Sequence, residues 1–168
     1  HTWKGESPVE TSRLQNQTPP GQVLIACQGH TLCQRSFRSI TCRSFPFFPY
    51  VTNGSEFLGL SYYWDYEDRC WVISNLNQVT SEYRHEFIAA YDLLFENMPQ
   101  EKETFRYHSG MMRRIFGRKH RAIPLLHRNG KAYKITPHNG RMRRVPIEAF
   151  PKFGPYQISA ILKFEDEF

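Results

Sequence analysis

Long apolar segments and the common catalytic motifs are both missing from this chain. No run of about 18 apolar residues occurs in the sequence, so no transmembrane helix is predicted. The G-x-S-x-G, P-loop, H-E-x-x-H and dinucleotide-binding fingerprints are also missing, which leaves open whether the protein is an enzyme. Apolar residues nevertheless make up 40% of the 168 residues and aromatic residues 15%, enough to bury a sizeable core. The composition therefore predicts a folded protein.

Acidic residues are missing from one long segment. Residues 104–147 (the basic segment) contain twelve Lys and Arg and no Asp or Glu. Residues 56–103 (the acidic segment) contain three basic and ten acidic residues. The formal net charge of +6 thus hides a block of +12 that directly follows a segment of −7. Such segregation favours contact with a polyanion more than a high isoelectric point alone would.

Arginine dominates the basic segment, and its planar guanidinium pairs bidentately with phosphate and stacks on bases. We therefore predict a surface that binds nucleic acid, with Tyr133 stacking on unpaired bases. The residues predicted to form this surface are Arg113, Arg114, Arg118, Lys119, Arg121, Arg128, Lys131, Lys134, Arg141, Arg143, Arg144 and Tyr133. If six of these charges contacted phosphates, log K would fall by about five for each tenfold increase in salt. The alternative is that the charges pair within the protein with carboxylates of the acidic segment.

Helical periodicity and capping residues predict two helices. Residues 81–98 carry apolar side chains at helical spacing, with Ser81 as the expected N-cap and Pro99 ending the helix. A shorter basic helix is predicted over residues 109–117, with Ser109 as its cap.

Turn signals predict most of the strands. Two Asn-Gly pairs separate three short segments between residues 122 and 147, which predicts a three-stranded meander, because a type I′ turn needs two residues with positive φ. Residues 57–64 and 70–76 are predicted to pair as a hairpin around an acidic loop, and residues 33–50 to be irregular. Two further strands are predicted, at residues 23–27 and 156–164.

These elements define the expected fold class and domain organisation. Strands outnumber helices and show no βαβ rhythm, so the class is α+β with a mainly antiparallel sheet. Polar residues 1–21 are predicted to form an N-terminal arm or linker, and residues 22–168 a single globular domain.

Metal and cofactor binding have little support in the sequence. Four potential zinc ligands occur close together: Cys27, His30, Cys33 and Cys42. Their spacing does not match the paired knuckles of structural zinc sites, so no metal and no cofactor is predicted. Four cysteines are few for a disulfide framework, which favours an intracellular protein. Their even number and two N-glycosylation sequons support the alternative of a secreted, disulfide-bonded domain that binds an acidic protein or a sulfated glycan.

Histidines of the basic segment support a further alternative. A nuclease could use His120, His127 or His138 as a general base beside arginines that stabilise the transition state. A binding surface also places histidines next to arginines, and no catalytic pair is predicted. The favoured prediction is a nucleic-acid-binding module, without a choice between DNA and RNA and without an oligomeric state.

Overall fold

The computed structural model describes residues 7–18, 20 and 32–153. The chain divides between Arg43 and Ser44 into two compact units, each of which is considered by itself. The expected domain boundary after residue 21 and the expected strands at 23–27 and 156–164 lie outside the described residues.

The first unit contains a helix in the segment predicted to be a polar arm. Ser7 Oγ accepts a hydrogen bond from the Glu10 backbone N–H at 3.1 Å, and Pro8 occupies the first turn, so helix α1 (Pro8–Gln17) begins there. No side chain of α1 is buried. Two short elements follow, η1 (Arg35–Phe37) and α2 (Ile40–Ser44).

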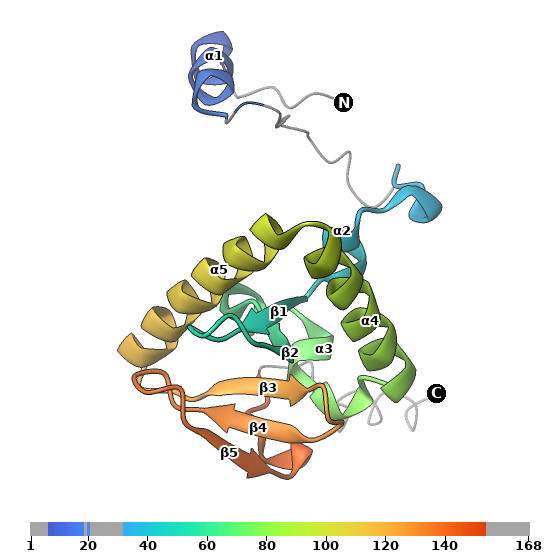
Figure 1. Cartoon of the computed structure of the whole chain (residues 1–168), viewed down its shortest axis with the longest axis vertical. Coiled ribbons are helices and arrows are strands. Elements are labelled where there is room, and N and C mark those ends of the chain that lie inside the picture. The colour runs from blue at the N-terminus through green and yellow to red at the C-terminus, as the bar shows by residue number, and fades with distance from the viewer. Residues whose placement is uncertain (1–6, 19, 21–31, 154–168) are drawn as a thin grey trace, which may run out of the picture. The chain divides into compact units, whose positions relative to one another are not determined.

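The second unit is α+β, as predicted, with one five-stranded antiparallel sheet (Figure 1). The strands follow the chain order across the sheet: β1 (Phe47–Val51), β2 (Phe57–Tyr62), β3 (Ile123–His127), β4 (Ala132–Ile135) and β5 (Met142–Val145). The helical elements are η2 (Trp64–Tyr66), α3 (Trp71–Ser74), η3 (Leu76–Gln78), α4 (Ser81–Asn97), α5 (Pro99–Arg118) and η4 (Ile147–Ala149). Within the described residues, no helix combines the length and apolar character needed to cross a membrane.

The predicted meander is confirmed. β3, β4 and β5 are joined by the two Asn-Gly turns, whose glycines Gly130 and Gly140 have φ values of 80° and 69°. The expected turn type was wrong, because neither Asn129 nor Asn139 has positive φ and a type I′ turn needs it at both residues. The asparagine side chains complete the turns, since Asn129 Oδ1 accepts from Lys131 N at 3.0 Å and Asn139 Oδ1 from Arg141 N at 2.9 Å.

The predicted partner of residues 57–64 was wrong. β2 pairs with β1, which lies in the segment expected to be irregular, and residues 70–76 instead form α3 and the start of η3. All positions of β1 and β2 are buried, so the alternation that would mark these strands is missing. β1 lies at an edge of the sheet, which tolerates Pro49 because proline has no N–H to donate.

The basic helix is longer than predicted. α5 begins at Pro99, which therefore starts a new helix as well as following α4. Ser109 is a buried interior residue of α5 rather than its cap. Its Oγ donates to Phe105 O at 2.8 Å and accepts from Val51 N at 3.0 Å, which satisfies a backbone donor of β1.

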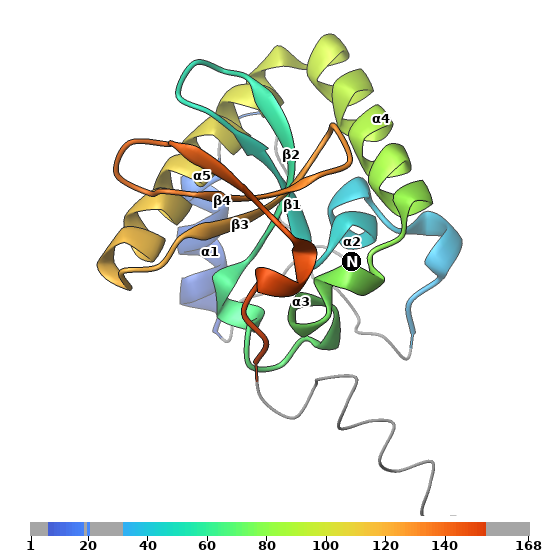
Figure 2. The same ribbon diagram turned by 90° about the horizontal axis from the view of Figure 1, so that it is seen from below.

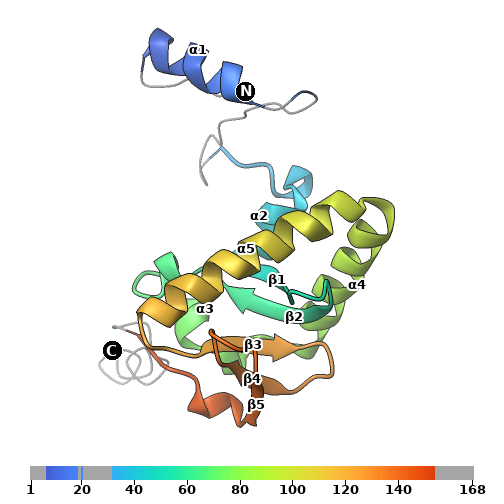
Figure 3. The same ribbon diagram turned by 60° about the vertical axis from the view of Figure 1, so that its left-hand side comes forward.

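The core lies between the sheet and the two long helices. α5 packs along β1 and reaches β3, while α4 packs against α5 and β2 (Figure 3). Tyr91 of α4 stands at the centre of an aromatic cluster whose other members are Phe57, Phe87, Phe95 and Phe105. This packing holds the basic C-terminal half of α5 beside the end of the meander.

Candidate nucleic-acid interface

Internal pairing accounts for a minority of the basic segment's charges. Three of its twelve basic side chains form ion pairs among the described residues, all with carboxylates of the acidic segment. The pairs are Arg106 with Glu103 at 2.7 Å, Arg121 with Glu67 at 2.6 Å and Arg128 with Asp92 at 2.8 Å. The internal-pairing alternative thus holds for these three arginines.

Arg121 is held by the most enclosed of these pairs. Its guanidinium contacts both oxygens of the buried Glu67, at 2.6 and 2.8 Å, and Tyr62 donates to the same carboxylate at 2.9 Å. The hydrogen bond with Glu67 raises the pKa of Arg121. Because removal of Arg121 would leave Glu67 buried and uncompensated, this arginine has a structural role whatever else it contacts.

Nine basic residues of the segment have no carboxylate partner among the described residues. Four lie on α5 and just after it: Arg113, Arg114, Arg118 and Lys119. Five lie on β4, β5 and their turns: Lys131, Lys134, Arg141, Arg143 and Arg144. The Lys119 ammonium sits 4.1 Å from the centre of the Trp64 ring, a cation–π contact that leaves its charge uncompensated.

A groove runs between the C-terminal half of α5 and two hairpin turns. Three adjoining cavities of about 310, 500 and 330 Å³ share Pro137 and His138 of the β4–β5 turn. We call them together the α5 groove. Its remaining polar and glycine lining comes from the β1–β2 turn, α5, the residues after α5 and the β4–β5 turn: Thr52, Asn53, Gly54, Gly110, Arg113, Arg114, Gly117, His120, Arg121, Thr136, Asn139 and Gly140. Figure 2 shows the β4–β5 turn on the side of the sheet where α5 ends.

The α5 groove has a one-sided electrostatic character. No carboxylate belongs to its lining in the described part of the chain, whereas Arg113 and Arg114 both do. A separate cavity of about 700 Å³ has mixed charge, with three carboxylates facing Lys102 and Arg128. The α5 groove is therefore suited to an anionic ligand, and the separate cavity is not.

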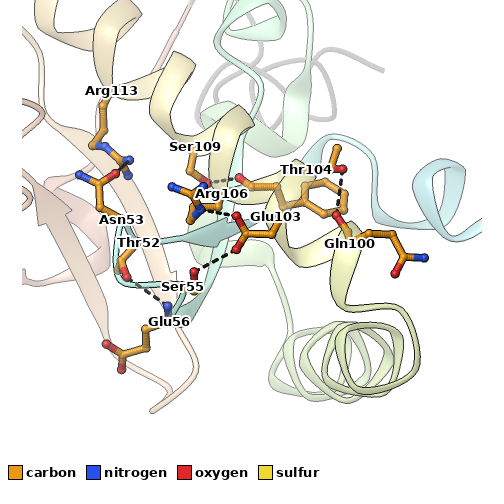
Figure 4. Close-up of polar contacts among 11 residues, drawn as sticks. Thr52, Asn53, Ser55, Glu56, Gln100, Glu103, Thr104, Arg106, Ser109 and Arg113 are labelled. Atoms are coloured by element: carbon orange, nitrogen blue, oxygen red, sulfur yellow. Dashed lines mark hydrogen bonds and ion pairs between the residues drawn. The ribbon is translucent and has the colours of Figure 1, made fainter. Parts of the chain in front are cut away.

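Arg113 is fixed at the centre of the groove. Its guanidinium donates to Tyr50 Oη at 3.0 Å. It also donates to Asn53 Oδ1 in the β1–β2 turn (Figure 4). Burial raises the pKa of Tyr50 and outweighs the opposing effect of Arg113, so the phenol stays neutral. Because neutral partners hold Arg113, its positive charge stays available to a ligand.

The turn that carries Asn53 is itself attached to α5. Ser55 donates to Glu103 Oε1 at 3.1 Å, and Glu103 also accepts from Arg106 (Figure 4). Inside the turn, Thr52 Oγ1 accepts from Glu56 N at 3.1 Å. The groove wall opposite the β4–β5 turn is thus preorganised.

Small residues keep the floor of the groove open. A Cβ added at Gly110 would meet only the Arg113 side chain at 3.6 Å, and one at Gly117 only Pro137 at 3.7 Å. Both positions present bare helix backbone between arginines, which lets a bulky phosphate group come close.

The predicted site residues are divided among three environments. The structure brings Arg113, Arg114 and Arg121 into the α5 groove, places Lys134, Arg143 and Arg144 on the meander, and pairs Arg128 with Asp92. Sequence reasoning missed Tyr50, Asn53 and Asn139. Asn53 and Asn139 each precede a glycine, which is a turn signal in the sequence, but the approach of these turns to α5 depends on tertiary packing.

The three candidate histidines lie in different places. His120 and His138 line the groove, whereas His127 on β3 packs against the Tyr133 ring with 5.1 Å between ring centres. Burial lowers the pKa of His127. No carboxylate accompanies His120 or His138 in the described groove lining, so no acid–base pair of that kind is formed there.

The potential zinc ligands form no described cluster. Cys27 and His30 lie outside the described residues, and the described residues hold no group of three or more His, Cys, Asp or Glu suited to a metal ion. Cys33, Cys42 and Cys70 are free thiols, and Cys33 Sγ accepts a hydrogen bond from Arg38 Nε at 3.3 Å.

Comparison with known proteins assigns the chain to no family. No protein-family model, no curated protein and no solved structure matches it. The function is therefore argued from the chain's own residues.

Proposed function

We propose that the protein is a nucleic-acid-binding module whose binding surface consists of the α5 groove and the basic residues of β4 and β5. The observation that carries this proposal is a groove whose described lining has no carboxylate and includes Arg113 and Arg114, two of the nine basic side chains without a carboxylate partner among the described residues. Like charges that no carboxylate compensates repel each other, and a polyanion relieves that repulsion.

The chemistry of the groove fits phosphate in particular. Arginine forks give directional, charge-assisted hydrogen bonds to phosphate oxygens, and the asparagine amides and open glycine backbone add neutral donors. Contacts to phosphates carry little sequence information, so modest sequence preference and strong salt dependence are expected.

The test is a binding titration against single- and double-stranded DNA and RNA at several salt concentrations. Arg114→Gln removes a groove charge, and Arg106→Gln removes a charge from the same helix that is already paired with Glu103. Removing one charge that neutralises a phosphate reduces the salt slope by about 0.9. Arg114→Gln is expected to show that reduction, and Arg106→Gln to keep the wild-type slope.

Two outcomes would overturn the proposal or its location. Absence of binding to every nucleic acid at low salt overturns the function itself. Equal effects of Arg114→Gln and Arg106→Gln overturn the groove as the site. Strand cleavage in the same incubations would support the nuclease alternative, and preference for heparin over nucleic acids would support the sulfated-glycan alternative.

A further inference from the structure

One face of the meander combines two rings and a guanidinium. Tyr133 on β4 is paired directly with Arg144 on β5, so both side chains point to the same face of the sheet. His127 on β3 packs against the Tyr133 ring from the other side. These three residues, here called the stacking patch, cross three neighbouring strands.

The ring of Tyr133 is fixed in position. Asn129 Nδ2 donates to Tyr133 Oη at 3.0 Å, and the Asn129 backbone N–H donates to His127 Nδ1 at 3.0 Å. One turn residue therefore holds both rings. Tyr133 stays partly exposed, and Arg144 is exposed without a carboxylate partner among the described residues.

The opposite face of the same strands differs in character. It carries the directly paired Lys134 and Arg143, two cations with no ring between them. Aromatic groups are thus placed with a cation on only one face of β4 and β5. Charged side chains alone would keep a surface solvated, so solvation does not account for the fixed rings of Tyr133 and His127.

We propose that the stacking patch binds unpaired bases, so that the partner of this protein is a single-stranded nucleic acid. This inference rests on the proposed function. A fixed, partly exposed ring offers a base an apolar surface at little entropic cost, and a planar guanidinium beside it stacks and contacts phosphate. In a duplex the faces of the bases are hidden by neighbouring base pairs, so the patch adds affinity only for single strands.

The experiment uses the full chain with two substitutions at one position. Tyr133→Leu removes the aromatic face, whereas Tyr133→Phe keeps the ring and loses only the hydrogen bond with Asn129. The probes are a twelve-nucleotide single strand with a central 2-aminopurine, whose fluorescence is quenched by stacking, and the duplex form of the same oligonucleotide. Thermal unfolding of each variant verifies that it is folded.

Tyr133→Leu is expected to weaken single-strand binding about tenfold and to abolish the quenching, because one stacked base is lost. Its salt slope and its duplex affinity are expected to match the wild type, since no charge changes. Tyr133→Phe is expected to keep most of the wild-type affinity and quenching, because the contact with the His127 ring still positions the aromatic face. Unchanged single-strand affinity in Tyr133→Leu, or an equal loss for the duplex, overturns this inference while leaving the proposed function standing. Failure of the wild type to bind either probe overturns both.

Discussion

Gly59 occupies a position in β2 that only glycine fits. Its φ is +141°, and a Cβ there would lie 2.3 Å from the backbone oxygen of Leu126 on the neighbouring strand. We predict that Gly59→Ala lowers the free energy of unfolding by about 2 kcal/mol or more, measured by urea denaturation. Gly54→Ala is the matched control, because its Cβ would meet nothing closer than Thr52 Oγ1 at 3.8 Å. Equal free energies of unfolding for the two variants would contradict the conclusion that only glycine fits at this position of β2.

The lowered pKa of His108 predicts that the fold becomes less stable as the pH falls. His108 lies on α5 against the rings of Phe48 and Tyr63, which also contact each other. Its Nε2 is buried without a hydrogen-bond partner, and burial lowers its pKa despite the opposing charge of Asp65. The unfolded chain, with an ordinary histidine pKa of 6.5, therefore takes up the proton first as the pH falls. The stability contributed by neutral His108 is fully present above that value and is lost as the pH drops through it, until the lower folded-state pKa is passed.

His108→Phe is predicted to flatten this dependence. The substitution keeps an aromatic ring in the cluster and removes the titrating group, so the melting temperature is expected to fall less between pH 8 and pH 5 than in the wild type. Part of the fall is expected to persist, because the pKa of His127 is also lowered by burial. Melting curves at matched ionic strength provide the measurement, and parallel pH profiles would contradict the assignment to His108.

At the scale of elements, α4 begins at Ser81 as predicted, but its N-cap is Thr80 and not Ser81. Thr80 Oγ1 accepts from Tyr83 N at 3.2 Å and caps the helix, whereas Ser81 Oγ only donates to the neighbouring Glu82 carboxylate at 3.1 Å. Thr80→Ala is predicted to cost about 1 kcal/mol of stability. Ser81→Ala should leave the unfolding midpoint near that of the wild type. Chemical denaturation of both variants checks the cap, and a larger loss for Ser81→Ala would place it at Ser81.

Helix α5 has room for a side chain at one of its glycines. Gly110 lies in the helix interior, and a methyl group there meets only the end of the flexible Arg113 side chain at 3.6 Å. Gly110→Ala should therefore raise the free energy of unfolding by up to about 1 kcal/mol, the difference in helix propensity. Denaturation curves measure the effect, and destabilisation would show that this part of the groove floor is more crowded than the 3.6 Å separation indicates.

Elements marked by strong local sequence signals could be predicted from the sequence, but which segments pair with each other in the sheet could not. Two Asn-Gly pairs specify the meander because each turn is determined by its own residues. β1 was missed because burial on both faces removes its alternation, and because Pro46 and Pro49 excluded a regular helix without indicating a strand. The N-terminal half of α5 was missed because Pro99 reads equally as an end and as a beginning.

The candidate site likewise has a part that the sequence predicts and a part that it does not. Composition alone located the basic segment, but which of its charges are neutralised depends on contacts between residues 54 apart in the case of Arg121 and Glu67, and 36 apart for Arg128 and Asp92. Arg113 lies on α5, and the residues that hold it, Tyr50 and Asn53, come from the β1–β2 hairpin. Spacing along the chain carries no signal for such contacts.

At the scale of the whole molecule, the acidic segment does not cancel the basic one. Its carboxylates pair with Arg106, Arg121 and Arg128, and the last two of these pairs connect segments that are far apart in the sequence. The charges left over gather on α5 and on the last two strands. The paired arginines thus link segments of the fold, and the unpaired ones belong to the proposed binding surface.

Substitutions on β5 can distinguish a role of its arginines in binding from a role in preventing self-association. β5 is the last strand of the sheet, so its outer edge has no strand partner among the described residues, and charged side chains on such an edge prevent pairing with another copy. Replacing Arg143 with Thr and Arg144 with Val is predicted to cause self-association in sedimentation velocity. Replacing both with Glu should leave the wild-type oligomeric state unchanged, because a negative edge also repels its copies, while oligonucleotide affinity falls steeply at low salt. If the double Glu variant binds as tightly as the wild type, Arg143 and Arg144 only protect the edge and contribute nothing to the proposed surface.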